Sequence, residues 1–128
     1  SRVLKESNND VATIISAGIT LHEALAAYEE LKADNILVRV IDLYSIKPID
    51  IVVLEASARL TKAIITVEDH YPEGGLGEAV MNALSNNITP VYSLAVRKMP
   101  KSGKMDELLN YEEISKNAII EEVKKAIK

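Results

Sequence analysis

The fold is decided by the stretch Val11-Ala12-Thr13-Ile14-Ile15-Ser16-Ala17-Gly18-Ile19-Thr20-Leu21-His22-Glu23-Ala24-Leu25. Its first five residues are typical of a buried strand, and Gly18 ends that strand. Thr20-Leu21-His22-Glu23 has the spacing of a capping box, in which the threonine oxygen accepts from a free backbone N–H and the glutamate reaches back to the cap. Apolar residues then recur at helical spacing, which predicts a helix to about Ala33. A buried strand followed by a capped helix indicates an α/β protein.

Strand-like and helix-like segments alternate along the rest of the chain. Asp34-Asn35 predicts a turn between the first helix and the next strand. We expect strands at 3–5, 36–41, 62–68 and 91–96, and helices from a cap at Asp50 to about 60, at about 76–86, and after a cap at Ser115. Parallel strands joined by right-handed crossovers carry helices on both faces, which explains why these strands are almost continuously apolar. The predicted fold is one three-layer α/β/α sandwich over residues 1–128.

The composition narrows the functional classes. The chain has 128 residues, a net charge of −4 and 48% hydrophobic residues, with five tyrosines as the only large rings. A net acidic chain is not typical of a duplex nucleic-acid binder. The absence of cysteine excludes disulfides, thiolate metal sites and a cysteine nucleophile, and it fits a cytoplasmic protein. No apolar run approaches the ~20 residues of a membrane helix, so we expect neither nucleic acid nor a membrane as a partner.

The stretch from Glu68 to Glu78 is the most unusual part of the sequence. It follows a predicted strand and precedes a predicted helix, at the sheet edge where open α/β proteins usually bind ligands. Glycines and a helix N-terminus can hold an anion, but the spacing matches neither a dinucleotide nor a Walker motif. Four carboxylates in this stretch would oppose a phosphate. We therefore consider both an anion-contact loop and a tight turn, with these residues as candidates: Glu68, Asp69, His70, Gly74, Gly75 and Gly77.

The two histidines leave alternatives open. His70 could act as a general acid or base, or make hydrogen bonds or a subunit contact. His22 is expected on the solvated flank of its helix. A metal site needs three or four convergent ligands, so no metal-binding residue is predicted in this chain.

A second candidate segment is the basic loop after the last strand. Arg97, Lys98, Lys101 and Lys104 could contact a phosphate or an acidic partner surface, or could simply be solvated.

Several motifs together resemble the C-terminal domain of transketolase, in order and spacing across nearly the whole chain. The residues that carry the resemblance are Thr20-Leu21-His22-Glu23-Ala24-Leu25, Ile46-Lys47-Pro48-Ile49-Asp50, Val67-Glu68-Asp69-His70-Tyr71, Glu73-Gly74-Gly75-Leu76-Gly77-Glu78-Ala79-Val80 and Val96-Arg97-Lys98-Met99-Pro100-Lys101-Ser102-Gly103-Lys104. Related thiamine enzymes share this domain, but the runs Glu68–Tyr71 and Lys101–Lys104 favour transketolase.

The resemblance implies a five-stranded mixed sheet whose first strand is antiparallel to the others. It also implies a cytoplasmic homodimeric transferase that moves a two-carbon ketol unit between sugar phosphates of the pentose phosphate pathway. Its thiamine diphosphate and its divalent metal, Mg²⁺ or Ca²⁺, would lie on other domains. No catalytic or cofactor-binding residue therefore carries over to this chain, which we expect to be inactive alone and to pack against those domains through the loop around His70 and Gly74–Gly77.

Two other hypotheses remain. The chain could be a free-standing regulatory or small-anion-binding module, because of its glycine turn and basic loop. It could also be one subunit of a split thiamine-dependent enzyme. Its start at Ser1, without methionine, is expected for a segment of a longer chain and equally for a processed tag.

Overall fold

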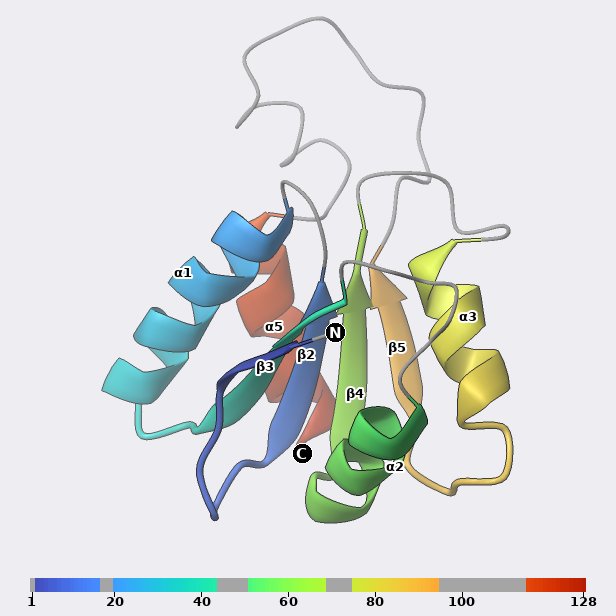
Figure 1. Ribbon diagram of the computed structural model, residues 1–128. Coiled ribbons are helices and arrows are strands. Elements are labelled where there is room, and N and C mark those ends of the chain that lie inside the picture. The colour runs from blue at the N-terminus through green and yellow to red at the C-terminus, as the bar shows by residue number, and fades with distance from the viewer. Residues whose placement is uncertain (1, 17–19, 44–50, 69–74, 95–114) are drawn as a thin grey trace, which may run out of the picture.

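The computed structural model describes residues 2–16, 20–43, 51–68, 75–94 and 115–128 (Figure 1). Within these ranges the strands are β1 (Arg2–Lys5), β2 (Ala12–Ser16), β3 (Val38–Asp42), β4 (Ala63–Val67) and β5 (Val91–Leu94). The helices are α1 (Thr20–Ala33), α2 (Ile51–Leu60), α3 (Leu76–Ala83) and α5 (Lys116–Ala126). None of these described helices is long and apolar enough to cross a membrane.

The strands form one mixed sheet in the order β1-β3-β2-β4-β5. β2 lies between β3 and β4 and is parallel to both, and β4 is parallel to β5. β1 pairs antiparallel with β3 at one edge of the sheet. The predicted α/β fold and the antiparallel first strand are therefore confirmed.

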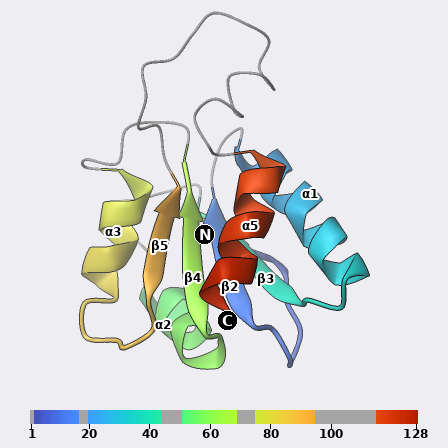
Figure 2. The ribbon, with the colours of Figure 1, turned by 180° about the vertical axis from the view of Figure 1, so that it is seen from behind.

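Two helical layers cover the two faces of the sheet, each over its own apolar core. α1 and α5 lie side by side on one face, and α2 and α3 lie on the other (Figures 1 and 2). Because side chains alternate along a strand, neighbouring residues belong to different cores. Ile14 and Ile65 are buried under α1 and α5, whereas Ile15 and Ile64 are buried with Leu54 of α2.

Helix α1 uses its predicted capping residues differently from the sequence expectation. The Thr20 hydroxyl donates to the backbone oxygen of Val67, 3.0 Å away, and so joins the helix to β4. The Glu23 carboxylate accepts from the backbone N–H of Lys116 at 2.8 Å. That contact supplies an acceptor to the first turn of α5, a helix 93 residues further along the chain.

The predicted turn after α1 is confirmed, and its geometry explains the residue that occupies it. Asn35 has φ 62°, in the left-handed region. Its N–H donates to Lys32 O and the N–H of Ile36 donates to Leu31 O, which is the Schellman pattern. Asparagine is one of the few non-glycine residues that adopt this conformation readily.

Two boundaries within the described residues differ from the sequence expectation by two residues or more. Strand β3 begins at Val38 rather than at residue 36, because Ile36 is engaged in the turn after α1. Helix α3 ends at Ala83 rather than near 86, since the N–H of Ser85 bonds to Asn82 O in a tighter turn. The predicted cap at Asp50 lies outside the described residues, whereas Ser115 caps α5 as expected, with its hydroxyl accepting from Ala118 N.

Candidate functional site

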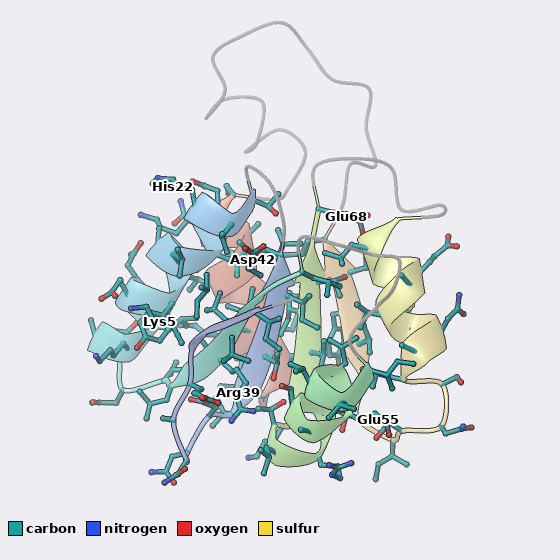
Figure 3. The ribbon with its side chains drawn as sticks, in the orientation of Figure 1. Lys5, His22, Arg39, Asp42, Glu55 and Glu68 are labelled. Carbon is teal, nitrogen blue, oxygen red and sulfur yellow. The ribbon has the colours of Figure 1, made fainter. Side chains whose placement is uncertain are left out.

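Only part of the sequence-predicted site falls within the described residues. Glu68, Gly75 and Gly77 are described. The remaining candidates lie outside the described residues, and their predicted contacts stay predictions: Asp69, His70, Gly74, Arg97, Lys98, Lys101 and Lys104. His22 is exposed near the start of α1, as expected (Figure 3).

Glu68 is the centre of the described part of the site. It directly follows β4, and its backbone N–H donates to Leu94 O, which holds it beside β5. The residue is only 1% exposed. Its Oε1 accepts from the backbone N–H of Leu76 at 2.8 Å, and its Oε2 accepts from that of Gly77 at 2.7 Å. One carboxylate therefore satisfies two of the amides that open α3. Figure 3 labels Glu68 between the end of β4 and the start of α3.

The electrostatics of this contact are favourable. The N-terminus of a helix carries partial positive charge, so a carboxylate in its first turn is stabilised. Hydrogen bonds from N–H groups to an ionised acceptor are also stronger than neutral ones. The N-cap residue of α3, Gly75, has no side chain that could cap the helix. Glu68 performs that task from the neighbouring strand end.

Gly77 lets α3 approach the sheet closely. A Cβ at this position would lie 2.7 Å from Ser93 Oγ and 3.1 Å from both Glu68 Oε2 and Thr66 Oγ1. The first distance is shorter than a non-bonded carbon–oxygen contact allows. A side chain at this position would therefore require Ser93 or the helix to shift, and the three nearest atoms are all polar oxygens.

Two buried hydroxyls complete the surroundings of Gly77. Thr66 on β4 and Ser93 on β5 are register partners, so their side chains lie next to each other on the α3 face. Neither Thr66 Oγ1 nor Ser93 Oγ has a hydrogen-bond partner among the described residues. Buried hydroxyls without a partner are unusual and mark this polar cluster as distinct from the surrounding core.

The geometry favours a structural role for Glu68. A general base must reach a substrate proton within hydrogen-bond distance. Glu68 is enclosed and both of its oxygens face the backbone of α3. From the sequence we expected the negative charge of Glu68 to oppose the binding of an anion at the helix N-terminus. In the structure its own carboxylate is the anion, so the described amides of Leu76 and Gly77 are already occupied.

A metal site does not form in the described part of the chain. No group of three or more His, Asp or Glu side chains converges there as ligands would have to. A group of paired charges lies at the opposite edge of the sheet, where the parallel strands begin. There Arg39 on β3 contacts Asp10 at 3.3 Å, Glu6 at 3.8 Å and Ser57 of α2 at 3.4 Å (Figure 3). This network ties the amino-terminal edge together and has no residue that the sequence analysis proposed as functional.

The fold and the capped helix together define an open α/β domain whose strand-end carboxylate is used for structure. Comparison with known protein families gives the particular family. The family described as "Transketolase, C-terminal domain" matches residues 1–119. The chain belongs to this family.

Close relatives are transketolases and transketolase-like proteins. The chain is 51% identical over 126 residues to "Transketolase-like protein 1" of Macaca fascicularis, covering 97% of this chain and 21% of the relative. It is 51% identical over 126 residues to "Transketolase" of Mus musculus, covering 97% of this chain and 20% of the relative. The chain therefore spans about a fifth of the length of these relatives.

Solved structures show the same fold. A chain of "Split gene transketolase, inactive beta4 tetramer" superposes with a TM-score of 0.90 at 38% identity, covering 98% of this chain and 41% of that chain. The transketolase of Campylobacter jejuni superposes with a TM-score of 0.67 at 18% identity, covering 96% of this chain and 18% of that chain, and it supports the fold alone.

Proposed function

We propose that the chain is the C-terminal scaffold domain of a thiamine-dependent transketolase. The complete enzyme would transfer a two-carbon ketol unit from a ketose phosphate to an aldose phosphate in the pentose phosphate pathway. The observation that carries the scaffold role is the buried Glu68, whose carboxylate fastens α3 to the sheet instead of facing a ligand. The relatives named transketolase support the parent activity.

The surface supports association with other domains or subunits. The exposed large apolar side chains of the described residues all lie in or next to the α2/α3 layer: Ile51, Val52, Leu60, Met81 and Ile88. The outward positions of α5, by contrast, are polar, and Lys116 and Lys124 join it to α1 through ion pairs with Glu30 and Asp34. Exposed apolar side chains gathered on one layer are typical of a surface that another protein surface covers.

The described contacts at the start of α3 do not support a site there for the cofactor that this family membership implies. A diphosphate would require free amides or cations at a helix N-terminus, and Glu68 already occupies those of α3. A divalent metal would require converging oxygen ligands, which the described residues do not provide. In this proposal thiamine diphosphate and its metal are bound by the other domains, and no chemical step is assigned to this chain.

The proposal is tested by measuring transketolase activity of residues 1–128 alone, of the polypeptide that lacks this domain, and of the two mixed together. Residues 1–128 alone, with thiamine diphosphate, Mg²⁺, a ketose phosphate and an aldose phosphate, should show no turnover. The longer polypeptide without this domain should lose activity or its native assembly, and adding residues 1–128 in trans should restore part of it. Turnover by residues 1–128 alone would refute the scaffold role.

The docking surface is tested in the same reconstitution. Val52→Asp and Met81→Asp place a charge on the α2/α3 layer and should weaken the restored activity. Asn117→Asp, at an exposed position of α5 on the opposite layer, is the matched control and should restore activity as the unmodified chain does. Equal behaviour of all three variants would exclude the α2/α3 layer as the contact surface.

A second candidate is a subunit encoded apart from its catalytic partner. The high similarity to the split-gene transketolase chain favours it. The mass of the native polypeptide in source cells separates the two candidates. A band near the full length of a transketolase, about five times the 14.0 kDa of this chain, indicates a domain of one long chain, and a band far below that length indicates a separate subunit.

A further inference from the structure

A pocket of about 610 Å³ opens at the amino-terminal edge of the sheet, far from Glu68. Its lining residues come from the C-terminal end of α2 and from the segment that leads into β5. Both of these segments are at the lower end of the ribbon in Figure 1. Glu68 is at the opposite, upper end (Figure 3). The volume of the pocket is within the range of roughly 300–1,000 Å³ that is usual for small-molecule sites.

The charge of this pocket is unusual for an acidic protein. Arg59 and Lys62 line it, and none of its eight lining residues is acidic, although the whole chain has a net charge of −4. Within the described ranges, neither the guanidinium of Arg59 nor the ammonium of Lys62 forms an ion pair or hydrogen bond, whereas the side chains of Arg39, Lys116 and Lys124 all pair with acids. Two cationic residues therefore line one hollow, and no acid lines it with them.

The walls of the pocket are held in place by the fold. The Thr89 hydroxyl donates to Ala58 O at 2.5 Å and joins the wall that leads into β5 to α2. Thr61 donates to Ser57 O at 2.8 Å, and its backbone N–H donates to the same oxygen. Pro90 O accepts from Ile64 N at 2.9 Å. The segments that carry Arg59, Lys62 and Asn87 are consequently fixed relative to one another.

A second pocket on the other layer provides an internal comparison. It has a volume of about 360 Å³ and is lined by Glu121, Glu122 and Lys125 of α5. It thus has two acids and one base, against two bases and no acid in the first pocket. An anion should be attracted by the first pocket and repelled by the second.

We propose that the pocket between α2 and β5 binds a phosphate dianion, either free or as the head group of a small metabolite. The guanidinium of Arg59 can contact two phosphate oxygens at once, and the ammonium of Lys62 adds a second positive charge. The amide of Asn87 can hydrogen-bond a sugar hydroxyl, and Ile88 and Pro90 offer an apolar wall. This site does not depend on the proposed function, because neither Arg59 nor Lys62 is used there. The two share only Ile88, which is also one of the exposed apolar side chains of the α2/α3 layer.

A competing explanation for the cations is helix stabilisation. Arg59 lies in the last turn of α2, where a positive charge interacts favourably with the helix dipole. That explanation predicts a change in stability but no ligand. The two are separated by measuring phosphate binding and thermal stability on the same variants.

The test is a heteronuclear NMR titration of residues 1–128, which close two apolar cores without a partner. The probes are inorganic phosphate, glucose 6-phosphate and unphosphorylated glucose. We expect saturable shifts of the amides of Arg59, Lys62 and Asn87 with both phosphates and none with glucose. Tighter binding of the ester identifies a metabolite head group, and equal binding identifies free phosphate.

Charge-removal variants make the test specific. Arg59→Gln with Lys62→Gln should weaken phosphate binding by about tenfold or more. Lys125→Gln with Lys128→Gln removes the same charge from α5 and its end, and should leave the affinity unchanged. The proposal is overturned if no saturable shift occurs, if both double variants lose affinity equally, or if the shifts map to α5.

Discussion

The carboxylate of Glu68 accepts a 2.7 Å hydrogen bond from the backbone N–H of Gly77, nine residues further along the chain. The same side chain also accepts from Leu76 N at 2.8 Å. The end of β4 and the first turn of α3 are therefore held together by one buried ionisable group. The contact joins residues on either side of segment 69–74, and all of them belong to the Glu68–Glu78 stretch that the sequence analysis identified as unusual.

Replacing Glu68 by glutamine should destabilise the domain by about 1–3 kcal/mol, because an amide offers only one oxygen to two N–H donors. Its NH₂ group would face a backbone N–H that has lost its acceptor. Urea unfolding followed by circular dichroism measures the change. Glu29→Gln, the same substitution at an exposed position of α1, is the control and should stay within about 0.5 kcal/mol. Similar values for the two variants would show that Glu68 does not fasten α3.

Replacing Gly77 by alanine should cost about 1–3 kcal/mol despite the better helix propensity of alanine, because the new Cβ meets Ser93 Oγ at 2.7 Å. Ser93→Ala alone should be close to neutral, since its hydroxyl has no partner among the described residues. In the Ser93→Ala background the cost of Gly77→Ala should fall. A double-mutant cycle in urea measures this coupling, and strictly additive costs would contradict the steric explanation.

The fold could be predicted because its determinants are local. Apolar runs such as Val11–Ile15, the turn at Asp34-Asn35 and the cap at Ser115 each act within a few residues. The observed end of an element differs from the predicted one where a residue suits two local structures. Ile36 has strand propensity, but its N–H is used by the turn after α1.

The contacts around the site could not be predicted because they join distant segments. Glu23 has the position of a capping-box residue, yet its carboxylate contacts Lys116, 93 residues away. Glu68 lies a few residues before the glycines Gly74–Gly77 in the sequence. Its hydrogen bonds to Leu76 and Gly77, however, depend on how α3 is placed over β4 and β5. Knowing that a strand end and a helix start meet at one edge of the sheet is the only sequence signal that points to this contact.

The buried pair of Arg39 and Asp10 should dominate the stability of the amino-terminal edge. Their side chains are 9% and 2% exposed, and Asp10 also accepts from the N–H and hydroxyl of Ser7. Asp10→Asn leaves a buried guanidinium without its close partner and should cost roughly 3 kcal/mol. Glu6→Gln changes a 62% exposed partner at 3.8 Å and should cost less than about 1 kcal/mol. Urea unfolding measures the loss of stability in both variants. An equal loss would contradict the view that burial makes the Arg39–Asp10 pair the stronger contact.

The conformation of Asn35 predicts opposite effects for two small substitutions. With φ at 62°, Asn35→Gly should be neutral or stabilising by a few tenths of a kcal/mol, whereas Asn35→Ala should destabilise by about 1 kcal/mol. Thermal unfolding compares the two variants with the unmodified chain. Ala33→Gly, two residues earlier and still helical, should instead be destabilising. A stabilising Asn35→Ala would show that the Schellman turn does not control this helix end.

The ion pair between Lys116 and Glu30 gives a prediction about alkaline pH. The 2.6 Å contact raises the pKa of Lys116 above 10.5, first through the hydrogen bond to Glu30 and then through its charge, with a smaller contribution from Glu23. Because the folded-state pKa is raised, the stabilisation is complete below pH 10.5 and is lost as the pH rises through the folded-state value. Glu30→Gln should lower the pKa of Lys116, measured by ¹³C NMR at its Cε, and should do so more than Glu23→Gln. A larger effect of Glu23→Gln would show that the charge of Glu23, and not the contact with Glu30, sets this pKa.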